Sequence, residues 1–270
     1  MTAVHLVVAL LPEAKPLIEH FRLKASNTSP FKIYGGDAVH LIISGVGKTR
    51  SAAAVVFLYE HSGRTRNSIW LNIGLGGHSD FEIGTGFLAH KITDQASSRS
   101  WHPPQIKKPP CGTAAVLTVG RPEANYAQPC VYEMEAAGFY ETATRFSTSE
   151  LIQCFKVISD NRTTGPNLSG EQAERLIANQ TGTIEKLMED LKALTRRLPA
   201  PFRSKREFER IAKRWHFTVT QRHQLVRILE RLKTLEASGE ILNGDFEGLR
   251  SASEVLQALE RRMALVPVKL

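Results

Sequence analysis

The sequence predicts an α/β fold around a mainly parallel sheet, followed by a smaller helical segment. Over the first 190 residues, short runs that are apolar at every position alternate with helical patterns. Such runs are typical of strands that are buried on both faces of a sheet. Glycine or proline follows several of these runs, as expected where a strand turns into a helix. A basic, proline-bearing linker, Arg196–Pro201, then leads to helical patterns alone.

Each strand is predicted from a run of Val, Ile and Leu, and each helix from apolar residues three or four positions apart. The expected strands are 4–10, 39–44, 68–73, 83–92, 114–119 and 152–159. The expected helices are 12–21, 49–60, 134–146 and 171–194, and beyond the linker 203–215, 219–237 and 252–264. The chain is therefore expected to form an α/β domain over residues 1–195 and a basic helical extension over residues 196–270.

Charge is distributed unevenly along the chain. Residues 191–270 hold 17 Lys and Arg against 9 Asp and Glu, whereas the first 190 residues hold 18 of each. This asymmetry suggests that the extension meets nucleic acid or an acidic protein. A solvated helical face explains the charge equally well, and the extension could instead cover the active site or lengthen a dimer interface. Its aromatic residues, among them Trp215 and Phe217, are expected to form a small core.

Composition excludes several classes of protein. With 42% hydrophobic and 23% charged residues, the chain is neither disordered nor collagen-like. The three cysteines, Cys111, Cys130 and Cys154, form no CxxC pair, which fits a reducing compartment. The apolar run at 4–11 is too short to span a bilayer and lacks the basic start of a signal peptide. A cytoplasmic protein with no membrane partner is expected.

One glycine-rich turn is close to a phosphate-binding loop. Ser44-Gly45-Val46-Gly47-Lys48-Thr49 ends like the P-loop motif, but the first glycine of that motif would fall at Ile42. The turn therefore argues against a nucleoside triphosphatase. It can still present backbone N–H groups to an anion or a sugar hydroxyl. The histidines at 78, 90 and 102 are too scattered to predict a metal site.

Carboxylates follow several of the predicted strands. Glu13 comes after the first strand, Glu133 and Glu135 flank the start of a helix, and Asp160 ends the strand at 152–159. Each of them alone could simply favour a helix start or a turn. Because the carboxyl ends of parallel strands meet at one edge of a sheet, these side chains are expected to converge there. An acid, a base and a carboxylate that binds hydroxyl groups could then act together.

Five segments of the chain match one known family in order: Val8–Ala14, Ser44–Lys48, Asn72–Gly77, Val131–Gly138 and Ile158–Asp160. Together they resemble the purine nucleosidase and phosphorylase superfamily, most closely the methylthioadenosine/S-adenosylhomocysteine nucleosidases. The resemblance covers about residues 3–195. It implies a three-layer α/β/α fold with a mixed, largely parallel sheet, a homodimer, a small-molecule nucleoside as substrate, and no cofactor or metal.

The resemblance also implies roles for individual residues. Asp160 would protonate the departing base, and Glu13 would orient the attacking water. Glu135 would bind the ribose hydroxyls, with Met134 packed on the ribose and Glu133 and Ser159 as support. The remaining residues expected to line the substrate are Gly74, Gly76, Gly77 and Arg99.

Three departures from the family keep alternatives open. Leu75 stands where the family has a serine, and no Gly-Asp-Pro-x-Arg phosphate motif follows the first strand. The segment 119–131 is short; its Tyr126 could stack on a base, but a surface position is the expectation. The predicted function is a purine-nucleoside N-ribohydrolase. The alternatives are a phosphorylase, and a degenerate nucleoside-binding module whose extension docks on nucleic acid or protein.

Overall fold

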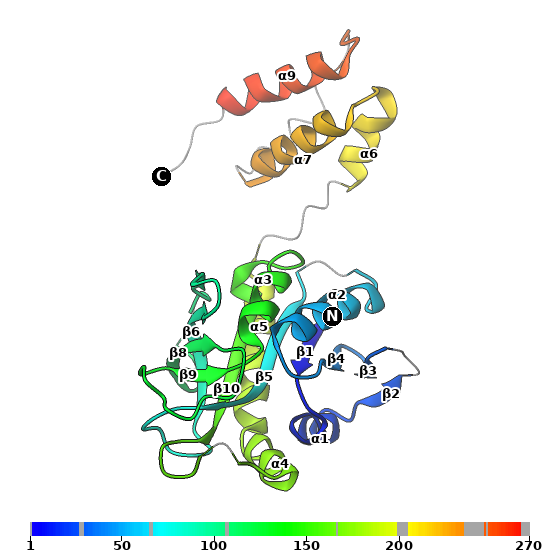
Figure 1. Ribbon diagram of the computed structural model, residues 1–270. Helices are drawn as coiled ribbons and strands as arrows, with labels where there is room; N and C mark the ends of the chain where they lie inside the picture. Colours follow the sequence, from blue (N-terminus) through cyan, green and yellow to red (C-terminus); the bar gives the residue numbers. More distant parts are fainter. Residues whose placement is uncertain are drawn as a thin grey trace. The chain divides into compact units, whose positions relative to one another are not determined.

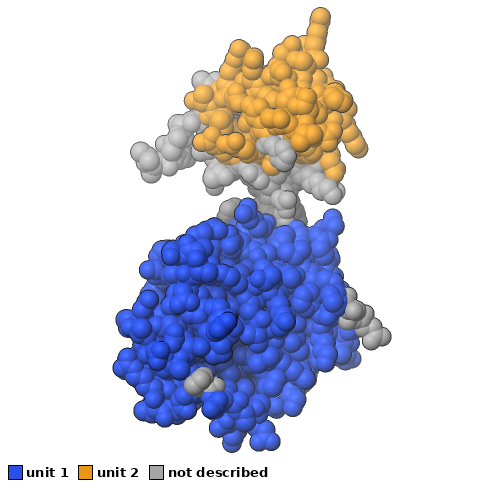
Figure 2. Space-filling view, in the orientation of Figure 1, with its two compact units in different colours: residues 1–197 blue, residues 198–270 orange. Residues whose placement is uncertain are grey.

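The computed structural model divides into two compact units, Met1–Arg197 and Leu198–Leu270 (Figure 2). It describes residues 2–26, 30–64, 67–105, 108–165, 167–198, 205–234, 246 and 248–265. The predicted linker lies at this division, and its residues 199–201 fall outside the described residues.

The first unit has three layers, α/β/α, as the family resemblance implies (Figure 1). Its strands are β1 (Val4–Val8), β2 (Lys24–Ser26), β3 (Lys32–Gly35), β4 (Val39–Ile43), β5 (Ile69–Gly77), β6 (Gly86–Asp94), β7 (Ser100–Trp101), β8 (Gly112–Thr118), β9 (Val131–Glu133) and β10 (Ile152–Asp160). Its helices are α1 (Leu11–His20), α2 (Lys48–His61), α3 (Ala136–Ala143), α4 (Gly170–Ala178) and α5 (Thr181–Thr195), with a 3₁₀ turn at Ser149–Leu151. Helices α2 and α3 pack together on one face, and α1 packs with α4 and α5 on the other.

The sheet is mixed and partly closed on itself. Strand β5 pairs in parallel with both β1 and β10, while β6 pairs in parallel with β8 and antiparallel with β10. Strand β9 joins β8 to β5, so that β5, β10, β6, β8 and β9 form a ring. The ring brings the carboxyl ends of β5, β9 and β10 together, and the residues that follow these strands therefore become neighbours.

The core forms because the strand residues are large and apolar on both faces. All nine residues of β10 are buried, as are all five of β1. The main cluster packs Trp70 from the sheet against Phe139 from α3 and Val55 from α2. Burial of such side chains contributes about 1.5–3 kcal/mol each, which explains why the apolar runs dominate the fold.

Three predicted elements differ from the structure. The helix expected over 171–194 is two helices, α4 and α5, because the Gln180 side-chain amide donates to the carbonyl of Gly84 (2.8 Å) and the chain turns there. Strand β5 does not end at Ile73 but continues through the glycines to Gly77. The helix expected over 134–146 spans only Ala136–Ala143. Strands β2, β3, β7 and β9 were not predicted, since each has four residues or fewer.

The second unit contains α6 (Lys205–Arg214), α7 (Val219–Thr234) and α9 (Ala252–Leu265). Trp215 and Phe217 are buried with Leu225 and Val255, which confirms that the aromatic residues of the extension form a small core. The Trp215 indole N–H donates to the carbonyl of Leu249 (3.0 Å). Among the described residues of the whole chain, no helix combines the length and the apolar character needed to cross a bilayer.

A buried histidine occupies the core of the first unit. His5 of β1 is fully buried, with its ring centroid 4.3 Å from that of Trp70 and 5.6 Å from that of His40. Burial, and secondarily His40, lowers the pKa of His5 from 6.5 to about 3. Burial also lowers the pKa of His40, which faces His61. Since none of these neighbours is an acid, protonation of His5 has no counter-charge.

We expect this histidine to make the fold sensitive to acid. Between pH 6.5 and pH 3 the unfolded chain binds a proton at His5 that the folded chain excludes, so the free energy of unfolding falls as the pH falls. The slope for one group is about 1.4 kcal/mol per pH unit, or about 2 kcal/mol between pH 6.5 and pH 5. Urea unfolding at both pH values should show this loss for the natural chain and for the exposed control His90→Leu, and a smaller loss for His5→Leu, in which His40 remains. Parallel losses in all three proteins would contradict it.

Candidate active site

The predicted carboxylates gather at the carboxyl edge of the sheet. Glu13 lies in the first turn of α1, directly after β1. Glu133 ends β9, Glu135 precedes the first residue of α3, and Asp160 ends β10. All four are buried, with exposed fractions between 4% and 9%. Buried carboxylates require partners, and the partners here define two neighbouring sets of contacts.

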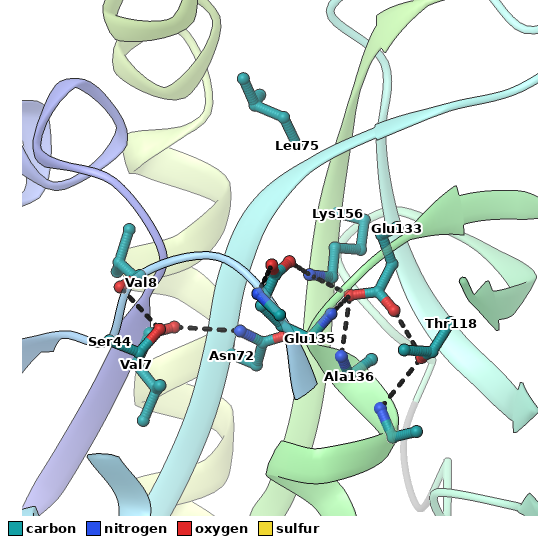
Figure 3. Close-up of polar contacts among 12 residues, drawn as sticks. Val7, Val8, Ser44, Asn72, Leu75, Thr118, Glu133, Glu135, Ala136 and Lys156 are labelled. Atoms are coloured by element: carbon teal, nitrogen blue, oxygen red, sulfur yellow. Dashed lines mark hydrogen bonds and ion pairs between the residues drawn. The ribbon is translucent and has the colours of Figure 1, made fainter. Parts of the chain in front are cut away.

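The first set surrounds Lys156, a buried lysine of β10 (Figure 3). Its ammonium lies 2.8 Å from Glu133 Oε2 and 3.9 Å from Glu135 Oε2. Burial alone would lower the pKa of Lys156, but the two carboxylates outweigh it and raise that pKa. The lysine is therefore a fixed positive charge beneath the site. Its register partner on β5 is Gly74, where a Cβ would lie in van der Waals contact with the ammonium.

Both carboxylate oxygens of Glu133 have partners within the protein. Its Oε1 accepts from the Thr118 hydroxyl (2.5 Å), and its Oε2 accepts from the backbone N–H groups of Glu135 (2.9 Å) and Ala136 (2.8 Å) as well as facing Lys156. These N–H groups belong to the start of α3, where a negative charge is favourable. Glu133 thus fixes α3 and Lys156 in place, and both of its oxygens are engaged within the protein.

Glu135 keeps one carboxylate oxygen available. Its Oε1 accepts from the Gly47 backbone N–H (2.8 Å), so the glycine turn before α2 binds a carboxylate of the chain itself. Among the described residues, its Oε2 has only the long contact to Lys156. Burial raises the pKa of Glu135 to about 7, with Lys156 opposing the shift and Glu133 adding to it. Near neutral pH this group can therefore either accept or donate a hydrogen bond.

Glu13 also interacts electrostatically with this lysine. Its Oε2 accepts from the Leu10 N–H (2.9 Å) and its Oε1 from the Leu75 N–H (3.1 Å). Burial raises the pKa of Glu13, although these N–H groups and Lys156 act in the opposite direction. Leu75 contributes its backbone here, while its side chain points away from the polar contacts (Figure 3).

The second set surrounds Asp160. Its two carboxylate oxygens accept from the hydroxyl groups of Ser159 and Tyr126, and its carbonyl accepts from the His78 N–H (3.0 Å). Asp160 is opposite Gly77 of β5, and Lys156 is opposite Gly74. Three strand positions separate the two sets, or roughly 10 Å at about 3.3 Å per residue. The site therefore has a carboxyl group at one end and a lysine–carboxylate cluster at the other.

The structure places the other predicted residues in different ways. Gly76 lies against β9, because a Cβ on it would come within 2.6 Å of Val131. Met134 is half-buried beside the cluster formed with Leu117, Tyr126 and their neighbours. Arg99 is not brought to the carboxylates: its guanidinium pairs with Glu141 (2.6 Å) and lies 5.1 Å from the Trp101 ring centre.

Two residues of the site were not predicted from the sequence. Lys156 was not singled out, although a lysine inside an otherwise apolar strand is the signal that could have found it. Tyr126 was expected at the surface, and this was wrong: it is 1% exposed and its hydroxyl contacts Asp160. Among the described residues, no group of three or more His, Cys, Asp or Glu side chains is arranged to hold a metal ion.

Several solved nucleosidases share the fold of this chain. 5′-Methylthioadenosine nucleosidase from Arabidopsis thaliana superposes with a TM-score of 0.59 at 16% identity, covering 71% of this chain and 96% of that chain. The first unit has the nucleosidase fold. The Helicobacter pylori 5′-methylthioadenosine/S-adenosylhomocysteine nucleosidase, solved with butyl-thio-DADMe-Immucillin-A, gives a TM-score of 0.55 at 12% identity over 70% of this chain and 99% of that chain.

A futalosine hydrolase mutant from Helicobacter pylori shares the nucleosidase fold as well, with a TM-score of 0.53 at 12% identity over 70% of this chain and all of that chain. No protein-family model matches the sequence, and a search of curated proteins finds no match. The chain thus adopts the nucleosidase fold that the resemblance of the five sequence segments implies.

Proposed function

We propose that the first unit is a nucleoside N-glycosidase that uses water to cleave the bond between ribose and a purine base. The observation that carries this proposal is the placement of Asp160 three strand positions from the cluster of Glu13, Glu135 and Lys156. A ribose with its base fits such an arrangement, with the base toward Asp160 and the sugar toward the cluster. The proposal does not depend on the second unit.

Asp160 acts as the acid. As the bond between C1′ and the base nitrogen breaks, its electron pair moves to the base, and Asp160 gives the base a proton. Such proton transfer contributes about 10²–10⁴-fold to the rate. Ser159 orients the carboxyl group through its hydroxyl.

The cluster serves the sugar and the nucleophile. The free Oε2 of Glu135 accepts from the ribose hydroxyls, while Glu13 orients a water molecule toward C1′ and takes up its proton. The raised pKa of Glu13 suits a base working near neutral pH. Lys156 holds these carboxylates in position and limits their mutual repulsion. Water oxygen thus forms the new bond at C1′, and the proton lost by Asp160 is restored from solvent.

Water rather than phosphate is favoured by the charge of the cluster. Three glutamates face one lysine, which already pairs with Glu133. A phosphate dianion placed there would meet an excess of negative charge, whereas phosphate sites use paired arginines or lysines. The solved proteins with this fold also include a nucleosidase and a futalosine hydrolase.

The decisive experiment is base release from purine nucleosides, followed by chromatography with and without phosphate. The panel contains methylthioadenosine, S-adenosylhomocysteine, adenosine and inosine. We expect free base without phosphate and no stimulation when phosphate is added. Release only with phosphate would indicate a phosphorylase. Binding of nucleoside without release by the folded protein would indicate a binding module.

A further inference from the structure

The middle of the loop between β8 and β9 carries a single buried side chain. Residues 119–130 connect the two strands, and Val119 and Cys130, next to the strands, are buried. Within the segment 120–129 between them, Tyr126 is the one buried residue, with 1% of its surface exposed. Every other residue of the segment is exposed except Glu123, which is half-buried. Loops of this kind separate easily from the body of a protein because little apolar surface holds them. The middle of the loop is thus anchored chiefly through one aromatic ring.

That ring lies where a leaving base would have to contact the acid. The Tyr126 hydroxyl donates to Asp160 Oδ2, and Ser159 occupies Oδ1. The ring also lies directly on Gly77, since a Cβ at that position would come within 2.6 Å of Tyr126 Cε1 and 2.4 Å of Asp160 Oδ2. No space remains between this strand and the ring for a planar base, and both oxygens of the acid are engaged.

The backbone of Tyr126, the residue that anchors the loop, is strained. Tyr126 has a φ of 43°, in the left-handed region that bulky residues avoid. Its conformation is held by the contact with Asp160, by Arg162, which donates to the Tyr126 carbonyl (3.4 Å), and by an edge-on contact with Tyr132. Burial, and then the facing Asp160, raise the pKa of Tyr126, so the hydroxyl keeps its proton and remains a donor. Breaking the hydroxyl contact would release the strain and favour movement of the loop.

We propose that Tyr126 is a gate residue: with its loop at 120–129 it covers Asp160, and it must leave this position before a purine base can reach the acid. This inference rests on the proposed function, since it concerns the base end of that site. The gate makes access to Asp160 a separate step from the chemistry. Only a small fraction of molecules then has the gate open, and the apparent affinity for the base is lowered in proportion to that fraction.

Variants at Tyr126 test the gate. Tyr126→Ala removes the ring, Tyr126→Phe removes only the hydroxyl and keeps the packing, and Tyr34→Phe is a matched change on the distant strand β3. We expect Tyr126→Ala to bind free adenine about tenfold or more tightly by calorimetry and to raise kcat/KM for base release by a similar factor. Tyr126→Phe should show a smaller gain in both, and Tyr34→Phe no change.

Hydrogen–deuterium exchange gives a readout independent of turnover. In the natural chain, saturating adenine should speed exchange across residues 120–130, because the base displaces Tyr126. Slower exchange, with weaker adenine binding by Tyr126→Ala, would mean that the tyrosine closes on the base and would overturn the gate. If all proteins release no base but Tyr126→Ala gains adenine affinity, the gate stands and the proposed hydrolysis fails. Absence of adenine binding in every variant overturns the gate.

Discussion

Replacing Asp160 by asparagine is expected to lower kcat for base release by about 10²–10⁴-fold, since the amide has no proton to give to the leaving base. The fold should persist. The amide oxygen can still accept from the Tyr126 hydroxyl, and the amide N–H group can donate to Ser159, so both neighbours keep a partner. Unfolding by urea should therefore change little, and the loss of rate should appear at nearly unchanged stability.

The nature of the leaving group separates an acid from a structural residue. A 4-nitrophenyl riboside releases a phenolate that needs no proton near neutral pH. Asp160→Asn should retain most of its activity on this substrate while losing it on purine nucleosides. The exposed Asp37→Asn serves as a control and should match the natural chain on both substrates. Equal losses on the two substrates would contradict the acid role.

Replacing Lys156 by methionine is expected to lower the free energy of unfolding by about 3–5 kcal/mol, because it leaves buried carboxylates without their cation. Glu133 is buried, and the pKa of Glu135 stays near 7 because the ammonium, together with the Gly47 N–H, offsets its burial. Without Lys156 the pKa of Glu135 should rise further, and the stability loss should be smaller at low pH. Urea unfolding at pH 7.5 and pH 5.5 measures both effects.

A surface lysine gives the matched comparison. Lys15 pairs with Glu174 at 3.1 Å, but both side chains are well exposed. Lys15→Met should therefore change the free energy of unfolding by no more than about 1 kcal/mol. Adding Glu133→Gln to Lys156→Met should recover part of the loss, because one unpaired charge is removed. If Lys156→Met lowered the free energy of unfolding no more than Lys15→Met does, the buried ammonium would not be stabilising the carboxylates of the cluster.

Sequence patterns predicted the long elements and failed where tertiary contacts decide. The run around Leu6 and Val7 has a strong apolar signal and forms β1 as expected. The break between α4 and α5 depends on the side chain of Gln180 reaching Gly84, a contact 96 positions away in the chain. Strand β9 has three residues, too few for any periodicity, and it is recognisable only from its pairing with β8 and β5.

The site divides in the same way. Carboxylates after strands could be recognised from position alone, and Glu13, Glu135 and Asp160 do lie at one edge of the sheet. Tyr126 could not, because it lies in a polar segment with proline on either side, at 122 and 129, where a tyrosine is ordinarily exposed. Its burial depends on the absence of a side chain at Gly77, which only the folded structure reveals.

The contacts of Glu133 have an evolutionary consequence. One carboxylate serves Thr118, the first N–H groups of α3 and the ammonium of Lys156 at once. Loss of Lys156 alone leaves the buried carboxylate of Glu133 without its cation. Loss of Glu133 alone leaves the buried ammonium of Lys156 without this partner and removes the acceptor of the first N–H groups of α3. Single substitutions are therefore disfavoured at both positions, and descendants of this chain should exchange Glu133 and Lys156 together, as a linked pair that drifts far more slowly than the loops around it.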